Sequence, residues 1–327
     1  MMHDIVTFGE VMIRLSPPDH QRLEQARSLD MHPGGAELSV AADASRLGLR
    51  TAWISKLTSN PLGRFIANKA REQGVDVSHV VWTGEGRIGI YYLEIGSTPR
   101  PSQVVYDRAD SSVNLIKVGE VDWAKILGKS KMLHTSGITP ALSRNCRDVT
   151  LEAIEAAKKA DCKVSFDLNY RSKLWSPAEA KECFSKLLNK VDIIITTQFD
   201  AETVFGLTGS YEDIARKLAD MSGCSVVAIT LREVRTVKTG AWTSLALADG
   251  KVYRGEVYDL EIVDRLGAGD SFTAGFLCGY LESDVQTGIL YGDSMAALKH
   301  TVPGDIAWIS KEEVLQRAKS KDFRIQR

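Results

Sequence analysis

The sequence predicts an α/β protein in which a doubly wound, mostly parallel sheet carries helices on both of its faces. Short apolar and β-branched runs alternate with longer amphipathic segments along most of the 327 residues. Some runs, such as Ile193–Ile195, are apolar at every position, which is typical of strands buried on both faces of a parallel sheet. Regular alternation of strands and helices favours this architecture. Beside the α/β body we expect a small projecting β-sheet.

The expected strands and helices follow from these runs and from helix-end signals. The predicted strands of the main sheet cover Ile5–Phe8, Thr51–Ser55, Met132–Thr135, Val164–Asp167, Ile193–Thr196 and Val226–Thr230. Helical periodicity, closed in two cases by a glycine, marks the segments between and after them. The predicted helices cover Ala36–Leu47, Leu62–Gln73, Arg144–Lys159, Pro177–Leu188, Gly269–Leu281 and Val285–Lys299.

Two segments, at about residues 10–33 and 87–108, break the alternation. The first has turn-forming residues without a convincing helix, and the second has two strand-like runs around a proline-bearing loop. We expect both to form the projecting sheet, as insertions in one domain that spans residues 1–327. Farther on, Trp242–Leu247 and Val252–Val257 flank an Asp-Gly turn and predict a second hairpin.

Composition excludes several functional classes. The chain has 41 basic and 42 acidic side chains, so it lacks the global positive field of a nucleic-acid binder. No apolar run approaches the roughly 18 residues that cross a bilayer, and the N-terminus has no signal-peptide pattern. Five cysteines without a Cys-x-x-Cys pair argue against a disulfide framework or a zinc site. We therefore expect a cytoplasmic protein with no nucleic-acid or membrane partner.

Two glycine-rich motifs fail on their context. Gly84–Gly89 matches the pattern G-x-G-x-x-G, but a dinucleotide site must open a helix, and the residues that follow are strand-like. A hairpin turn is the better interpretation. Gly128-Lys129-Ser130 resembles the end of a P-loop, yet Trp123 occupies the position of the first glycine. We reject both as ligand sites.

A third motif, Gly267-Ala268-Gly269-Asp270, joins a strand-like run to an apolar helix. Glycines allow close backbone approach, and the free amides of a first helical turn can stabilise a transferring phosphoryl group. Asp270 could accept a proton from a substrate hydroxyl. The positive helix end is expected to keep it ionised and weakly basic, which a loose phosphoryl-transfer transition state tolerates. The alternative is an aspartate that only caps the helix.

These residues, with Pro33–Ala41 and Leu47-Gly48, resemble the motifs of the ribokinase-like (phosphofructokinase B) carbohydrate kinases over essentially the whole chain. The stretches His134–Ser143, Ser165–Trp175 and Lys299–Asp305, and Asp264-Arg265 before the glycine turn, look like those of 2-keto-3-deoxygluconate kinases in particular. The resemblance implies an ATP-dependent kinase that converts 2-keto-3-deoxygluconate to 2-keto-3-deoxy-6-phosphogluconate. It also implies that the projecting sheet is a lid and that two lids pair in a homodimer.

Carried over by position, the resemblance assigns roles to individual residues. Asp270 would be the catalytic base, and the amides of Gly267, Ala268 and Gly269 would form the anion hole. The sugar would contact Gly34, Gly35, Glu37, Tyr91, Tyr106, Arg108, Arg171 and Asp305. The nucleotide would lie near Asn169, Thr197, Arg232, Gly240, Gly267 and Gly269. Mg²⁺ would accompany ATP, held mainly by phosphates and water, with Asp200 acting through water as the candidate protein ligand; a monovalent-cation requirement stays open.

The sequence departs from the family pattern at three places. Ser39 stands where many members have asparagine, the Mg²⁺-associated Asn-x-x-Glu element reads Thr197-Gln198-Phe199-Asp200, and the nucleotide segment Leu231–Gly240 is longer and more charged than usual. Two arginines nevertheless suit an acidic sugar, because a guanidinium forms a planar fork for a carboxylate. The alternatives are a kinase for fructose or another keto sugar, or a catalytically silent sugar- or nucleotide-binding relative.

Overall fold

In the computed structural model, which describes residues 2–319, a nine-stranded sheet forms the centre of the molecule. The strand order is β14-β13-β12-β11-β10-β9-β1-β4, and β15 pairs with β13. Neighbours from β4 to β12 are parallel, whereas β13 pairs antiparallel with β12, β14 and β15. The strands are β1 (His3–Phe8), β4 (Thr51–Ile54), β9 (Ser130–Ser136), β10 (Lys163–Asp167), β11 (Ile193–Thr197), β12 (Val226–Val234), β13 (Thr239–Ala248), β14 (Lys251–Arg254) and β15 (Tyr258–Glu261).

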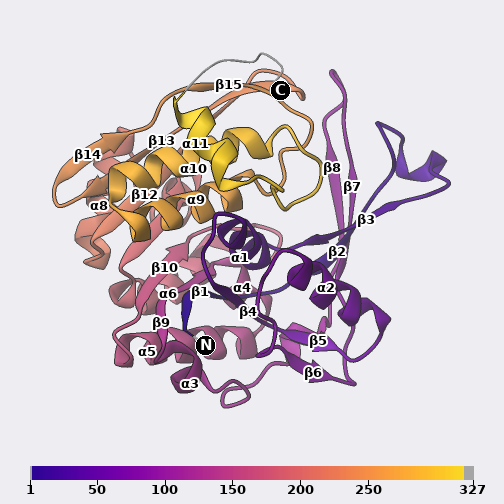
Figure 1. Cartoon of the computed structure of the whole chain (residues 1–327), viewed down its shortest axis with the longest axis horizontal. Helices are drawn as coiled ribbons and strands as arrows, with labels where there is room; N and C mark the ends of the chain where they lie inside the picture. Colours follow the sequence, from indigo (N-terminus) through magenta and orange to yellow (C-terminus); the bar gives the residue numbers. More distant parts are fainter. Residues whose placement is uncertain (1, 320–327) are drawn as a thin grey trace.

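Helices cover both faces of this sheet (Figure 1), which confirms the predicted fold class. Their apolar sides pack on two separate core clusters, one on each face. One face carries α1 (Ala36–Arg46), α9 (Ala268–Glu282) and α10 (Val285–Lys299). The other carries α3 (Trp123–Leu127), α5 (Arg144–Lys159), α6 (Pro177–Leu187), α7 (Gln198–Phe205) and α8 (Tyr211–Ser222). The remaining helices are α2 (Pro61–Glu72), α4 (Ile138–Leu142) and α11 (Lys311–Lys319).

Local helix signals explain most of these boundaries. The Ser176 side chain accepts a hydrogen bond from the Glu179 amide, and Pro177 occupies the first helical position, so α6 begins where the sequence predicts. The sequence analysis did not predict α7 or α8. Helix α8 begins with the same kind of capping box, Ser210 with Asp213, and this signal could have located it. Helix α7 follows β11 directly, but Thr197 caps its first turn and Gly206 ends it with φ +71°, and these signals could have located it.

A second, four-stranded sheet stands at one side of the molecule (Figure 1). Its order is β3-β2-β7-β8, with β2 and β7 parallel. The strands are β2 (Met12–Ser16), β3 (Asp30–Gly34), β7 (Ile90–Glu94) and β8 (Gln103–Asp107). The predicted segments 10–33 and 87–108 therefore do combine into a separate small sheet. A two-stranded sheet of β5 (Lys56–Thr58) and β6 (Val81–Thr83) was not predicted.

The rejected glycine motifs are turns in the structure. Gly84–Gly89 connects β6 to β7, so a strand follows it and no helix N-terminus is available for a dinucleotide. Gly128-Lys129 connects α3 to β9. No helix within residues 2–319 is long and apolar enough to span a membrane. All five cysteines are free and buried.

Candidate active site

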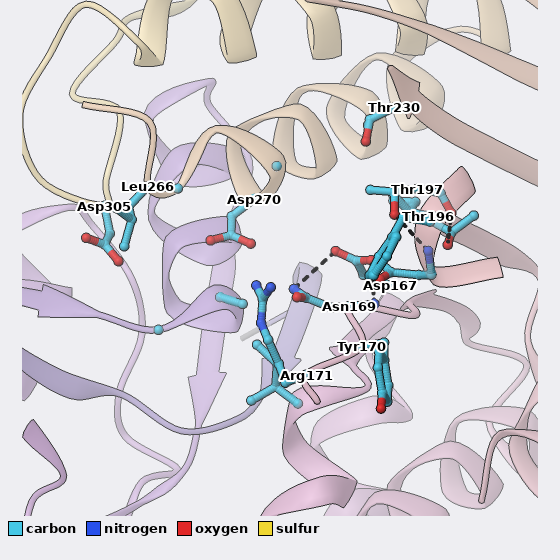
Figure 2. A pocket seen from close by; sticks show the side chains of 18 of the residues that line it. Asp167, Asn169, Tyr170, Arg171, Thr196, Thr197, Thr230, Leu266, Asp270 and Asp305 are labelled. Carbon is cyan, nitrogen blue, oxygen red and sulfur yellow. Dashed lines mark hydrogen bonds between the residues drawn. The ribbon is translucent and has the colours of Figure 1, made fainter. Parts of the chain in front are cut away.

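A cavity of about 870 Å³ opens at the carboxyl ends of the parallel strands, where α/β sheets commonly bind ligands. The ends of β10, β11 and β12 line one side of it, and residues of the small sheet line the other. Figure 2 shows side chains from the ends of β10, β11 and β12 and from the start of α9 around one hollow, with Arg171 and Asp270 pointing toward each other. The predicted residues that line it are Gly34, Gly35, Glu37, Tyr91, Tyr106, Arg108, Asn169, Arg171, Thr197, Asp200, Arg232, Gly267, Gly269, Asp270 and Asp305.

Two predicted residues do not line this cavity. Gly240 lies within β13, opposite Val234, and a β-carbon there would meet the Glu233 carbonyl at 2.3 Å. It was expected in a nucleotide loop, but the charged segment before it is the extension of β12 and a tight hairpin, so Gly240 serves strand pairing. Ala268, the first residue of α9, has a buried side chain, so only its backbone amide could face a ligand.

The glycine turn before α9 is fixed by a close backbone approach. Gly267 has φ +83°, and a β-carbon on it would lie 1.9 Å from the carbonyl oxygen of Asp305. No other residue fits there. The first amides of α9 have no intrahelical acceptor, because the helix begins at Ala268. The turn therefore presents bare N–H groups at the cavity.

Asp270, in the first turn of α9, has a raised pKa. The expectation of a pKa held low by the helix end was wrong, because burial and the negative charges of Asp167 and Asp305 outweigh that effect. Arg171 opposes the shift. A carboxylate with a raised pKa is a stronger base than an ordinary aspartate. Asp270 is not the N-cap of α9, because Gly267 holds that position, and no side chain within residues 2–319 makes a capping hydrogen bond there.

A buried ion-pair network joins the small sheet to the loop before α9. Arg14, 1% exposed in β2, lies 2.5 Å from Asp264 and donates to Asp305 at 2.9 Å. The Tyr91 hydroxyl, from β7, donates to the other Asp305 oxygen at 2.6 Å. The carboxylate of Asp305 is thus oriented by both elements before any ligand arrives. The close packing continues at Gly34, where a β-carbon would lie 2.4 Å from the Tyr91 hydroxyl oxygen.

Arg108 is held at the cavity wall by Glu10. Its guanidinium is hydrogen-bonded to one oxygen of Glu10, and Ser111 donates to the other at 2.5 Å. The guanidinium also stands over the Tyr106 ring, 5.6 Å from its centroid. Its Nε is buried and has no hydrogen-bond partner within the described residues. The side chain also lines the cavity, where a guanidinium is suited to a carboxylate ligand.

Glu37 is buried at the start of α1. One of its carboxylate oxygens accepts hydrogen bonds from the Ser136 amide at 3.1 Å, the Ser136 hydroxyl at 2.7 Å and the Thr139 hydroxyl at 2.8 Å. Burial raises its pKa, although these donors oppose the shift. The contacts fix Glu37 against β9, so only its second oxygen is available to the cavity.

The acidic side chains Asp167 and Asp200 lie near the basic side chain Arg171 in the cavity. Asp167, at the end of β10, has its pKa raised to about 7 by burial and by the charge of Asp200, while Arg171 lowers it. The Asn169 amide donates to Asp167 at 3.1 Å, and Thr197 caps α7 by accepting from the Asp200 amide at 3.1 Å. Two neighbouring carboxylates that repel one another fit a divalent cation shared with phosphates and water.

The sequence analysis assigned no site role to several polar residues of this region, among them Glu10, Arg14, Asp167 and Asp264. Asp167 ends a predicted strand at the carboxyl edge of the sheet, and that position is a usable signal. Asp264 precedes the glycine turn directly. Glu10 and Arg14 had no local signal, because their partners are far away in the sequence. Within residues 2–319, no group of three or more His, Cys, Asp or Glu side chains could hold a metal by itself.

The mostly parallel sheet, the glycine turn with its adjacent aspartate, and the arginines that line the cavity are typical of a phosphotransferase of the carbohydrate-kinase type. Residues 2–312 match the model of the pfkB family of carbohydrate kinases, and the chain belongs to this family. It is 42% identical over 328 residues to a 2-dehydro-3-deoxygalactonokinase of Haloferax volcanii, covering 100% of both chains. It is 31% identical to a 5-dehydro-2-deoxygluconokinase of Bacillus licheniformis, covering 97% of both.

A solved structure is similar over the same extent. The crystal structure of a 2-dehydro-3-deoxygluconokinase from Thermotoga maritima superimposes with a TM-score of 0.95 at 38% sequence identity. The alignment covers 98% of this chain and 99% of that one. The ribokinase-like fold is therefore shown, and the chain is a sugar kinase.

Proposed function

We propose that the chain is an ATP-dependent kinase that phosphorylates the terminal hydroxyl of 2-keto-3-deoxygluconate, also called 2-dehydro-3-deoxygluconate, to give the 6-phosphate. The observation that carries this proposal is the presence of Arg108 and Arg171 in one cavity with Asp270. A pocket for a sugar acid needs cationic side chains that bind the carboxylate at one end and a general base that accepts the hydroxyl proton at the other. Neutral sugars such as fructose have no use for two arginines.

The reaction follows from the groups around Asp270. Its carboxylate would accept the proton of the terminal hydroxyl while the hydroxyl oxygen attacks the γ-phosphorus of ATP. The bond between that phosphorus and the bridging oxygen of the β-phosphate would break, and ADP would leave. The free amides at Gly267–Gly269 would stabilise the negative charge on the transferring phosphoryl group. The raised pKa of Asp270 supports this role, since a base works best when its pKa approaches the working pH.

The nucleotide would lie on the side of the cavity formed by Asn169, Thr197 and Arg232. Mg²⁺ would be held by the phosphates, by water and by Asp200, with Asp167 adding negative charge beside it. Bound there, the ion would neutralise the phosphates and orient them. The mutual repulsion of Asp167 and Asp200 supports this assignment, because it is relieved when a cation arrives.

The small sheet would act as a lid and as a dimer surface. Its strands bring Tyr91, Tyr106 and Arg108 to the cavity, so closure would exclude water that competes with the sugar. The exposed side chains of Met31 and Val105, which the strand register places on the face opposite to Tyr91 and Tyr106, give this sheet an apolar surface suited to a second copy. Sedimentation equilibrium of the chain and of Val105→Lys tests the dimer.

A substrate panel tests the proposed activity. ADP release would be measured with 2-keto-3-deoxygluconate, its C4 epimer 2-keto-3-deoxygalactonate, 5-keto-2-deoxygluconate, fructose and ribose. The epimer is a specific second candidate, because the Haloferax volcanii relative carries that name. We expect the two 2-keto-3-deoxy acids to exceed fructose and ribose by at least about tenfold in kcat/KM. A neutral sugar as the best substrate contradicts the proposal.

A further inference from the structure

Lys299, the last residue of α10, is a buried cation that the proposed chemistry does not use. Its side chain is 0% exposed, and its ammonium donates hydrogen bonds to two main-chain carbonyl oxygens. These belong to Asp264, at 3.1 Å, and to Val302, at 3.0 Å. Lysine is almost never fully buried without a paired charge, so this position needs a physical reason.

The two carbonyls come from the two loops that shape the anion hole. Residues 262–267 lead into α9, and residues 300–307 follow α10. The loops are joined by hydrogen bonds from the Val263 and Asp264 amides to the His300 carbonyl, and from the Gly304 amide to the Asp264 carboxylate at 3.1 Å. The Asp305 carbonyl also packs directly against Gly267. Lys299 therefore supports the backbone that presents the bare amides.

The charge of Lys299 balances the network next to this turn. Arg14 is shared by two carboxylates, Asp264 and Asp305. Burial lowers the pKa of Lys299, and the negative charges of Asp264 and Asp305 oppose that shift. Without the ammonium, two buried carboxylates would face one guanidinium. The surplus negative charge would lie beside the place that must accept the transferring phosphoryl group, where it would raise the barrier.

Carbonyl oxygens that converge on a buried cation are also the ligands that proteins use for potassium. An ammonium group carries the same charge and accepts the same ligands, but a covalent stem keeps it in place at any salt concentration. We propose that the Lys299 ammonium is a built-in monovalent cation that holds the two anion-hole loops together and makes turnover independent of added K⁺. Lys299 is a positioning residue, since it contacts the loops and not the reacting atoms.

This inference rests on the kinase activity and anion hole proposed above, and not on the choice of sugar. The assay uses whichever sugar the substrate panel identifies, and the unfolding measurements below need none. A wrong sugar assignment and a wrong cation assignment therefore give different results.

The first measurement is the rate of the unmodified enzyme with and without monovalent cations. ADP release is followed in tetramethylammonium salts, and K⁺, NH₄⁺ or Na⁺ is then substituted at constant ionic strength of about 0.1 M. We expect kcat to change by less than about twofold, because a covalently attached charge needs no ion. Activation by K⁺ of more than about fivefold overturns the proposal, even when no variant folds.

Two variants distinguish the effect of the Lys299 charge from the effect of its side-chain volume. Lys299→Met removes the charge but fills the volume, and we expect kcat to fall about 10- to 100-fold with a smaller change in the KM of the sugar. Lys299→Ala leaves the carbonyls facing a void. We expect about 100 mM K⁺ or NH₄⁺ to restore its kcat about tenfold and to raise its Tm above that in tetramethylammonium.

Lys56→Ala is the matched control. Lys56 is also buried; its ammonium donates to the Leu115 carbonyl at 3.2 Å and pairs with Glu120, and it does not line the cavity. This variant should lose stability but show no ion-specific rescue of rate or Tm. A Lys299→Met enzyme with full kcat contradicts the proposal. So does a K⁺ response of Lys299→Ala no larger than that of Lys56→Ala.

Discussion

The two sides of the cavity are built differently. On the side of the small sheet, Arg14, Glu37 and Tyr91 are buried and hydrogen-bonded to fixed partners. On the side of β11 and β12, Phe199 is 68% exposed, and Arg232 is exposed with its guanidinium stacked 5.3 Å above the Trp242 ring. Preorganised groups bind a specific ligand with little ordering cost, whereas open ones become ordered when the ligand arrives. On the sugar side, which faces the small sheet, these groups are fixed before a ligand arrives. On the nucleotide side Phe199 and Arg232 are exposed, although Asn169 and Asp200 are buried there.

From this comparison we expect some substitutions to lower kcat alone and others also to lower the free energy of unfolding. Asp270 lies between the two sides, and its loss should give the largest effect. We expect Asp270→Ala to lower kcat by about a thousandfold, within the range of removing a general base. ATP binding, followed by calorimetry, should be little changed. Stability should not fall, because the variant removes a carboxylate whose ionisation burial opposes. Retention of more than about a tenth of the rate contradicts the assignment.

Removal of Arg14 should cost the most stability. Arg14→Met leaves Asp264 and Asp305 buried with their shared partner gone, so we expect a loss of about 3–5 kcal/mol in the free energy of unfolding. On the nucleotide side, Arg232→Met should change stability by less than about 0.5 kcal/mol and should raise the KM of ATP. Urea unfolding of both variants measures the difference. Equal losses in the free energy of unfolding for Arg14→Met and Arg232→Met would contradict the difference between the two sides of the cavity.

Arg108 allows a test of acid recognition within the sugar side. Arg108→Gln should raise the KM of the acidic sugar about 10- to 100-fold, in line with the loss of a charged hydrogen bond worth about 1.5–3 kcal/mol. Activity toward a neutral sugar should not fall by a similar factor. Lys163→Gln, at a lysine that bonds the Tyr280 hydroxyl away from the cavity, is the control. An unchanged KM means that Arg108 only pairs with Glu10.

The smallest expected effect is a pH dependence of the ligand-free protein. Asp167 has its pKa raised to about 7 in the folded state, against about 3.9 for an unfolded aspartate. Between these values Asp167 is more protonated in the folded state than in the unfolded state. The contribution of Asp167 to stability is therefore fully present below about pH 4 and is lost as the pH rises toward 7. Asp167→Asn should flatten this decline by a few degrees in Tm, and Mg²⁺ with ATP should do the same for the unmodified protein. Identical Tm–pH slopes for Asp167→Asn and the parent contradict this assignment.

The two sides of the cavity also differ in how far the sequence alone could predict them. The nucleotide side arises from strand ends. The sequence analysis named Asn169 and Thr197 through the family resemblance, but the predicted strands that end at Asp167 and Thr196 lie next to them and are a usable signal. The anion-hole turn was recognisable because its glycines and Asp270 are contiguous. The sugar side was found only through the family resemblance, since Tyr91, Arg108 and Asp305 are far apart in the sequence.

The sequence by itself determined the α/β architecture, the small sheet, the helix boundaries at strong caps, and the turn at Gly267–Asp270, because periodicity, capping and glycine chemistry act within a few residues. Tertiary structure alone decided the pKa of Asp270, the pairing of Arg14 with two distant carboxylates, and the exclusion of Gly240 from the cavity. It also placed Lys299 under the anion hole. Burial and charge pairing depend on groups hundreds of residues apart, and no local pattern records them.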